Sequence, residues 1–197
     1  GLIAVVGTPA KLHVQIHTDI LSPYFANDSW KNRARLLIAP LVLWKACGIR
    51  VVSKRIRDSL IARYGRKIAQ PAVIPVALPN GVPEPVPLPA NPFMFTLIAV
   101  SRLEREKCVE DILAALDLAR RKYPGVGLFI AGEGRKRAAL ARRAEALGLS
   151  DAVVFLGNRA DAWGLMQSAQ AFVQASAYEG YGLTLLEAAL AGTPIVS

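Results

Sequence analysis

Two acidic and two basic side chains have types and spacings that suit a phosphorylated sugar. Glu179 and Glu187 are eight residues apart, and a carboxylate can accept hydrogen bonds from two neighbouring sugar hydroxyls at once. Between them, Gly182 opens a predicted helix, whose free amides and positive dipole favour a phosphate. Arg102 and Lys107 add positive charge that suits a diphosphate. Together these residues predict a site for a nucleotide-sugar, which has a sugar on each side of a diphosphate.

Strands and helices that alternate strictly along residues 95–197 must position these side chains. Strands are predicted over residues 95–100, 126–131, 152–156, 171–174 and 194–196, and helices over residues 107–122, 135–147, 161–169 and 182–190. Strict alternation is typical of βα units with a parallel sheet and right-handed crossovers. Ligands of an open parallel sheet bind beyond the carboxyl ends of its strands. The residues that follow the strands are therefore the candidates for a site.

The first part of the chain has a second set of elements and ends in a run of prolines. Strands are predicted over residues 11–17, 49–53 and 72–77, and helices over residues 29–46 and 54–64. Prolines then crowd residues 75–92. Because proline can neither donate to a strand ladder nor continue a helix, we expect an extended, semi-rigid linker between two domains there.

The composition is that of a folded protein with a basic first half. Of the 197 residues, 53% are hydrophobic and 20% are charged, which excludes an intrinsically disordered chain. Residues 1–90 carry twelve basic and four acidic side chains, whereas the remainder is nearly balanced. A basic face can attract nucleic acid, anionic lipid or phosphorylated substrates, or it can simply be solvated. Nucleic acid is the weaker choice, because the basic runs have no aromatic stacking platforms beside them.

Cysteines, histidines and apolar runs exclude several other classes. Cys47 and Cys108 are too few and too far apart for a disulfide framework, so we expect reduced thiols in a cytoplasmic protein. His13 and His17 on one strand would stand about 13 Å apart, too far to share a metal ion. The longest apolar run, residues 36–44, is shorter than the ~20 residues of a membrane span. We expect this run to form a buried core helix, with docking of the basic half on an anionic membrane as the alternative.

The two ends of the sequence suggest a piece of a longer protein. The chain begins without methionine and stops on a predicted buried strand. It shows no secretory signal peptide. We therefore expect a fragment, and each functional prediction refers to the longer protein.

The residues that follow the strands carry a resemblance to a known family. The motifs run in order along residues 97–197: Ser101-Arg102-Leu103, Lys107, Ala131-Gly132-Glu133-Gly134, Val154–Gly157, Ser176–Leu183, Leu186-Glu187-Ala188 and Gly192–Ser197. On these motifs the chain resembles the donor-binding domain of the GT-B glycosyltransferases, specifically the retaining enzymes of family 4. His17-Thr18-Asp19 also resembles a strand end that faces the cleft in family members, although the first half of the chain is the weaker match.

This resemblance implies an α/β fold of two Rossmann-like domains, both truncated in this chain. Residues 1–88 would be the C-terminal part of the acceptor-side domain with its proline-rich linker, and residues 89–197 the donor-binding domain, truncated at its C-terminus. The implied activity moves a sugar, with retention, from a UDP- or GDP-sugar to a lipid, glycan or small-molecule acceptor. No metal or other cofactor is expected. A cytoplasmic protein that binds no nucleic acid and that touches the inner face of an anionic membrane fits this activity.

The resemblance also implies roles for individual residues. Arg102 and Lys107 would stabilise the leaving diphosphate, Glu179 and His17 would approach the transferred sugar, and Glu187 would hold the ribose. The other expected donor-binding residues follow strands or open the last helix: Gly132, Glu133, Gly157, Gly180, Tyr181, Gly182 and Leu183.

One residue departs from the family's pattern, and two alternative functions stay open. Cys108 follows Lys107 where the family usually has glycine, and we expect it to act as a small filler. One alternative is another GT-B enzyme, such as a nucleotide-sugar epimerase or a sugar-phosphate synthase. The other is a non-catalytic fragment that only binds nucleotide-sugars.

Overall fold

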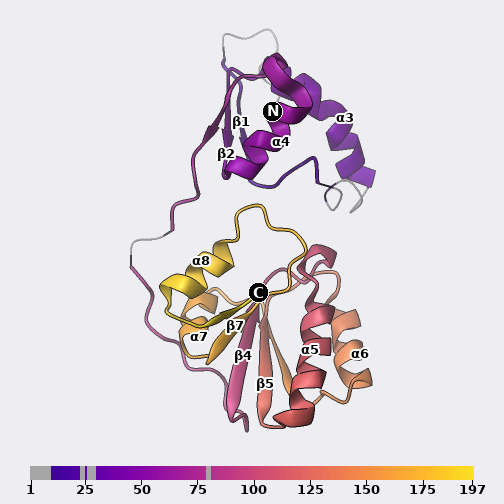
Figure 1. The fold of residues 1–197 in the computed structure, drawn as a ribbon, viewed down its shortest axis with the longest axis vertical. Helices are drawn as coiled ribbons and strands as arrows, with labels where there is room; N and C mark the ends of the chain where they lie inside the picture. The colour runs from indigo at the N-terminus through magenta and orange to yellow at the C-terminus, as the bar shows by residue number, and fades with distance from the viewer. Residues whose placement is uncertain (1–9, 23–24, 26–29, 79–80) are drawn as a thin grey trace. The chain divides into compact units, whose positions relative to one another are not determined.

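The computed structural model describes residues 10–22, 25, 30–78 and 81–197, which form two compact units. The N-terminal unit runs to Ala77 and includes Glu179–Tyr181. The C-terminal unit comprises Leu78–Tyr178 and Gly182–Ser197. Each unit has its own parallel sheet (Figure 1).

A three-stranded parallel sheet in the order β1-β2-β3 lies at the centre of the N-terminal unit. The elements of this unit are β1 (His13–Ile16), α3 (Trp30–Lys45), β2 (Gly48–Val51), α4 (Lys54–Tyr64), the 3₁₀ helix η1 (Gly65–Lys67) and β3 (Pro71–Val73). α4 begins where the Ser53 side chain accepts a hydrogen bond of 3.4 Å from the Ile56 amide. Ile49 and Val51 are buried and pack in one core with Ile56 and Leu60 of α4.

Two prolines fall inside elements predicted for this unit. One lies within a helix that forms as predicted, and the other lies where a strand ends earlier than predicted. α3 continues through Pro40, although proline removes one hydrogen bond from the interior of a helix. β3 ends at Val73 and does not reach residue 77, since Pro75 cannot donate to a strand ladder.

Five parallel strands in the order β6-β5-β4-β7-β8 form the sheet of the C-terminal unit. The strands are β4 (Phe95–Val100), β5 (Val126–Ala131), β6 (Val153–Gly157), β7 (Ala171–Val173) and β8 (Ile195–Val196). The helices are η2 (Arg105–Lys107), α5 (Val109–Lys122), α6 (Arg137–Ala146), α7 (Ala162–Gln167) and α8 (Leu183–Leu190). The chain steps outward from β4 to β6 and returns past β4 to β7, so the strand order reverses at β4, as in Rossmann-like sheets.

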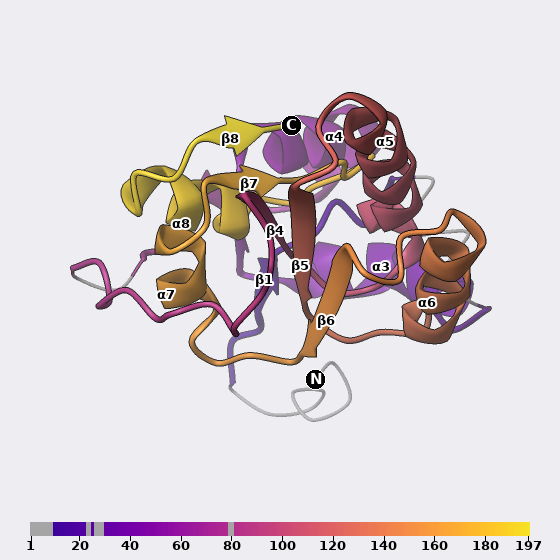
Figure 2. The ribbon, with the colours of Figure 1, turned by 90° about the horizontal axis from the view of Figure 1, so that it is seen from below.

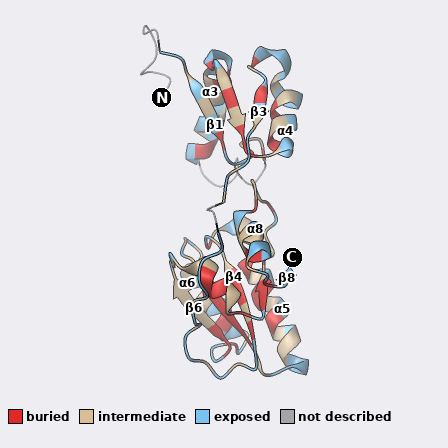
Figure 3. Ribbon diagram, turned by 90° about the vertical axis from the view of Figure 1, so that its left-hand side faces the viewer, coloured by how far each residue is buried: buried red, intermediate tan, exposed pale blue. Residues whose placement is uncertain are grey.

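Helices cover both faces of this sheet, because successive strand residues point to opposite sides. Leu128 and Ile130 of β5 pack in the core that includes α5 and α6. Phe129, between them, packs on the other side with Met166 of α7 and Ala188 of α8. Figure 2 shows α5 and α6 on one side of the strands and α7 and α8 on the other. Buried residues, red in Figure 3, line the strands between these layers.

The described part of the proline-rich segment has neither helix nor strand, but part of it is attached to the C-terminal unit. The Val86 amide donates to the carbonyl of Gly164 in α7 at 3.0 Å, and the Gln167 amide group donates to the carbonyl of Pro83 at 2.5 Å. A β-carbon on Gly164 would lie 2.7 Å from the Glu84 carbonyl oxygen, so glycine permits this approach. The second half of the predicted linker therefore packs on α7.

Candidate functional site

A cavity of about 410 Å³ opens at the carboxyl ends of β4, β5 and β6. It lies at the edge of the sheet where the sequence places ligand binding. Three of the predicted site residues, Arg102, Gly132 and Glu133, line it together. The remaining lining residues come from the same strand ends and from the starts of α7 and α8: Val100, Ser101, Ala131, Asn158, Arg159, Ala162 and Thr184.

Backbone hydrogen bonds join the loops that form this cavity. The Gly132 amide donates to the carbonyl of Gly157 at 2.7 Å, and the Leu103 amide donates to the carbonyl of Glu133 at 2.9 Å. The pairing of β5 with β6 shifts register after Ile130, so that Gly157 stands opposite Ala131. These bonds fix the loops after three strands relative to one another, which preorganises the cavity for a ligand.

Gly132 is required by the packing of the two loops. Its φ of 141° lies in the region that favours glycine. A β-carbon there would stand 1.8 Å from the carbonyl oxygen of Ser101, which no rotation of a side chain can relieve. The family resemblance led us to expect Gly132 among the donor-binding residues. The structure shows that it is also essential for the close contact between the loops after β4 and β5.

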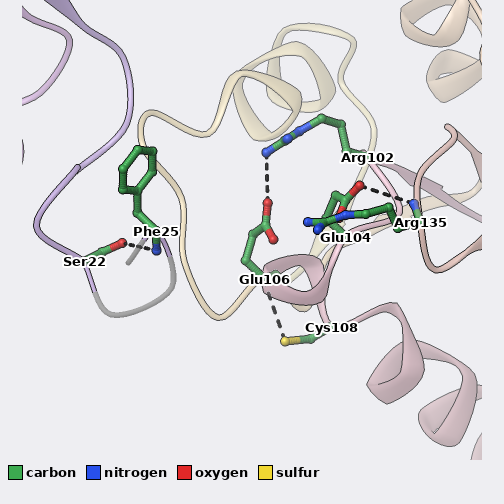
Figure 4. A network of polar contacts seen from close by, with 7 residues as sticks. All are labelled: Ser22, Phe25, Arg102, Glu104, Glu106, Cys108 and Arg135. Atoms are coloured by element: carbon green, nitrogen blue, oxygen red, sulfur yellow. Dashed lines mark hydrogen bonds and ion pairs between the residues drawn. The ribbon is translucent and has the colours of Figure 1, made fainter. Parts of the chain in front are cut away.

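Arg102 forms one ion pair and lies beside a second, but its own side chain stays largely exposed to solvent. Arg102 pairs with Glu106 at 2.9 Å, but its side chain is 73% exposed, whereas Glu106 is 19% exposed. Glu104 binds Arg135 at 2.7 Å. Burial alone would raise the pKa of Glu104, but the hydrogen bonds and charge of Arg135 outweigh it and hold this pKa below its usual value. Figure 4 shows the two pairs side by side, with the Arg102 guanidinium directed at the Glu106 carboxylate. An exposed pair of this kind is weak, so Arg102 can turn to an anionic ligand at little cost.

Arg159, at the end of β6, has its charge compensated within the protein. Its Nε and Nη2 donate to the two carboxylate oxygens of Asp161 at 2.7 Å and 2.6 Å. The hydrogen bonds from Arg159 lower the pKa of Asp161. This two-bonded pair holds the guanidinium plane in place. Of the two arginines that line the cavity, Arg102 can therefore leave its carboxylate partner and bind a diphosphate more easily than Arg159 can.

Cys108 occupies a backbone position that favours glycine. It is the one non-glycine residue with positive φ among the described residues, at φ 47° and ψ 40°, and it lies between η2 and α5. Its thiol is 3.6 Å from the Arg105 carbonyl oxygen. It is 3.8 Å from the Glu106 carbonyl oxygen, and Figure 4 shows this second contact. This conformation gives a physical reason for glycine after Lys107 in the resembling family. The expectation of a mere small filler missed the backbone conformation.

The start of α8 brings a residue into the cavity that the sequence did not single out. Gly182 caps the helix with φ 79°, and Leu183 begins it. The hydroxyl of Thr184 donates to Oε1 of the buried Gln174 at 3.0 Å, and Thr184 lines the cavity. The first amides of a helix have no partner within the helix, so this end can receive an anion. The available signal was the position of Thr184 in the first turn after the glycine.

The other predicted site residues do not line this cavity. Lys107 ends η2, and Glu187 lies on the last turns of α8. Partial burial raises the pKa of Glu187. His17 is exposed after β1 in the N-terminal unit, which also includes Glu179, Gly180 and Tyr181. The roles assigned to these residues remain predictions.

The described residues contain neither a metal-binding cluster nor a helix that could span a membrane. Within residues 10–22, 25, 30–78 and 81–197, no three His, Cys, Asp or Glu side chains gather where they could hold a metal ion. Of the helices described, none is both long and apolar enough to cross a membrane.

The sheet order and the cavity at its carboxyl edge are those of a Rossmann-like unit, and comparison with known proteins names its family. Residues 88–197 match the family model described as glycosyl transferases group 1. The match covers more than half of the chain, so the chain belongs to this family.

Relatives and solved structures agree with this family. Glycogen synthase of Mycobacterium tuberculosis is 44% identical over 103 residues, which are 51% of this chain and 25% of that protein. Alpha-monoglucosyldiacylglycerol synthase of Streptococcus pneumoniae is 33% identical over 104 residues, 52% of this chain and 24% of that protein. The crystal structure of Anabaena Alr3699/HepE with UDP and glucose superposes with a TM-score of 0.82 at 26% identity, covering 99% of this chain and 55% of that one.

These matches confirm the predicted fold class. The chain has the α/β fold with parallel sheets of GT-B glycosyltransferases. It spans about a quarter of the length of the two curated relatives and about half of the Anabaena protein.

Proposed function

We propose that the protein is a retaining glycosyltransferase that moves a hexose from a nucleoside-diphosphate sugar to an acceptor. The observation that carries the proposal is the cavity that Arg102, Gly132 and Thr184 line at the carboxyl edge of a family-typical sheet. UDP is the favoured nucleotide, with GDP as the second choice, because the structurally similar Anabaena protein was solved with UDP and glucose.

The chemistry proposed for the site is the stabilisation of a leaving group. Cleavage of the sugar–phosphate bond builds negative charge on the diphosphate, and donors placed there beforehand stabilise the transition state more than the ground state. Arg102, Lys107 and the first amides of α8 fill this role in the proposal. The acceptor attacks from the face that the diphosphate leaves, and the diphosphate takes the acceptor's proton, so that neither a metal nor a separate base is needed.

The carboxylates and the histidine are proposed to hold the two sugars. Glu187 accepts hydrogen bonds from the ribose, Glu179 binds hydroxyls of the transferred sugar, and His17 approaches that sugar from the N-terminal unit. The donor-binding backbone includes Gly157 and the segment Gly180–Leu183.

The acceptor is proposed to be a lipid or a glycan. The names of the two curated relatives, one a glucosyldiacylglycerol synthase and the other a glycogen synthase, support these classes. A lipid acceptor would place the protein at the inner face of a membrane.

Titration calorimetry with UDP, GDP and UDP-glucose tests the donor site. We expect binding of one nucleotide, at least tenfold weaker in Arg102→Ala and unchanged in Arg142→Ala, which removes an exposed arginine of α6. Binding that is absent, or equal in both variants, would contradict the proposed site.

Product analysis by NMR, with EDTA present, tests the reaction in the full-length protein. Transfer with the anomeric configuration retained is expected, and Lys107→Ala and Glu179→Ala should abolish it. A free epimerised nucleotide-sugar or a sugar phosphate as product would favour another GT-B reaction, and nucleotide binding without turnover would favour a binding fragment.

A further inference from the structure

The helix α3 presents large apolar side chains to solvent. The exposed fractions are 75% for Trp30, 81% for Leu37, 54% for Leu41 and 49% for Trp44. Their spacings of seven, four and three residues place all four on one face of the helix, at about 100° per residue. The apolar run over residues 36–44 is therefore not the buried core helix that the sequence favoured.

The opposite face of α3 is the one that packs on the N-terminal unit. Leu43 is 2% exposed and belongs to the core with Ile16 of β1 and Val51 of β2. Asn32 is also buried, and it accepts a hydrogen bond of 3.0 Å from Arg35. α3 is thus apolar on two sides, and only one side is used by the fold of the described residues.

Positive charges flank the exposed apolar face. α3 contains Lys31, Arg33, Arg35 and Lys45 and no acidic residue. At helical spacing, Arg33 lies along one margin of the face formed by Trp30, Leu37, Leu41 and Trp44, and Lys31 and Lys45 lie along the other. All three of these cations are exposed. Lysine and arginine can lay their stems on apolar groups and keep their charges at a polar boundary.

A second exposed apolar patch lacks this arrangement and serves as a comparison. Met94 is 88% exposed and Tyr123 is 56% exposed, and with Phe95 they line a cavity of about 510 Å³ at the amino ends of β4 and β5. Lys122 is the one charged residue of its lining, and it lies over the Tyr123 ring. Apolar exposure alone therefore does not distinguish α3. What distinguishes α3 is that an exposed apolar face, a tryptophan near each end and cations along both margins occur together.

We propose that α3 lies flat in the surface of an anionic lipid bilayer, with Trp30, Leu37, Leu41 and Trp44 inserted between the headgroups. Amphipathic helices with basic margins bind membranes in this way, and tryptophan favours the boundary between headgroups and acyl chains. The 16 residues of α3 give a helix about 24 Å long, which lies along the surface and does not span the membrane. The proposal deepens the proposed function, since its lipid-acceptor part rests on that function, but membrane binding needs no donor.

Flotation of the protein with vesicles tests this surface. Phosphatidylcholine vesicles are compared with vesicles that contain phosphatidylcholine and phosphatidylglycerol, at low and high salt and without nucleotide. We expect binding to the anionic vesicles only, weakened by salt. Leu37→Ser with Leu41→Ser should lower the partition coefficient by about tenfold or more. The matched control Met94→Ser, in the other exposed patch, should leave it unchanged.

Charge reversal and tryptophan fluorescence test the margins and the depth. Lys31→Glu with Lys45→Glu should abolish binding, whereas Arg142→Glu with Arg143→Glu, on α6, should not. In a Trp163→Phe background, which leaves Trp30 and Trp44 as the only tryptophans, anionic vesicles with brominated lipids should quench the fluorescence.

Four outcomes would overturn the proposal. They are no binding of the unchanged protein, equal loss in the control variants, no quenching, and a melting temperature of the Leu37→Ser, Leu41→Ser variant, measured without vesicles, that falls by more than about 5 °C, beyond what the lower helix propensity of serine explains. The last would show that protein covers this face, either another part of the polypeptide or a second copy, and light scattering would identify the second copy. Nucleotide binding measured on the same variants separates failure of this proposal from failure of the proposed function.

Discussion

Replacing Cys108 by glycine should stabilise the C-terminal unit. Cys108 holds φ 47° and ψ 40°, a left-handed conformation that costs an L-residue roughly 1–2 kcal/mol. Glycine adopts it without that cost. Glycine also loses more conformational entropy on folding, however, and this offsets about 0.4–1 kcal/mol of the gain in stability. The thiol contributes little in compensation, because its contacts with the two carbonyl oxygens are 3.6 Å and 3.8 Å long and a thiol is a weak donor.

The net expectation is a gain of about 0.5–1 kcal/mol in the free energy of unfolding. For a chain of this size, 1 kcal/mol corresponds to roughly 2–4 °C in Tm. Urea denaturation followed by circular dichroism, together with scanning calorimetry, measures both quantities. Because the chain has two compact units, the transition to be compared is that of the C-terminal unit, which nucleotide binding should identify by raising its Tm.

Cys108→Ala separates the backbone effect from the loss of the thiol. Alanine lacks the thiol but keeps the strained conformation, so we expect no gain in stability from it. Cys47→Ser, at an exposed cysteine of the other unit, should change nothing. If the alanine variant is as stable as the glycine variant, or if glycine lowers the free energy of unfolding, the argument from the left-handed conformation is refuted.

Three further predictions follow from the environment of single residues. Gly132→Ala should cost roughly 3 kcal/mol or more in urea denaturation, because its β-carbon would stand 1.8 Å from the Ser101 carbonyl oxygen; a loss below 1 kcal/mol would contradict this packing. Burial raises the pKa of Glu187, so this carboxyl favours folding when protonated and loses that contribution as pH rises through its folded pKa. Glu187→Gln should therefore raise Tm at pH 7 but not in acid. A difference in Tm that does not depend on pH would refute the raised pKa. Burial would raise the pKa of Glu110, but its hydrogen bond with Lys136 lowers this pKa overall. Its contribution to stability is therefore present above the unfolded pKa and is lost as pH falls through the folded pKa. Glu110→Gln should lower the free energy of unfolding by about 0.5–1 kcal/mol at pH 7 and not at all in strong acid, whereas an equal loss of stability at both pH values would point to packing instead.

The sheet of the C-terminal unit was predictable because its signals are local. The strands over residues 95–100 and 126–131 have the predicted bounds, since each is a largely apolar run that ends at a polar or glycine-rich segment. The cavity could be placed for the same reason, because the carboxyl ends of parallel strands share one edge. The helix predicted over residues 107–122 was only partly right, as the left-handed Cys108 separates η2 from α5.

Features that depend on contacts between distant segments could not be read from the sequence. Glycine at position 132 depends on the Ser101 carbonyl, and Thr184 lines the cavity only because α8 begins beside the end of β4. The exposed face of α3 was missed for a related reason. Residues 36–44 are apolar almost throughout, so no polar side marks which face points to solvent.

The contact at Gly164 sets the length of the tether between the two units. Pro83 and Val86 are hydrogen-bonded to α7, and the lack of a β-carbon at position 164 leaves room for the Glu84 carbonyl between them. A larger residue there would release the segment and add several residues to the freely moving connection, which spans about 3.1 Å per residue when proline-rich. The effective concentration of one unit near the other falls with roughly the −3/2 power of such a length. A single methyl group on α7 would thus have the effect of lengthening the linker.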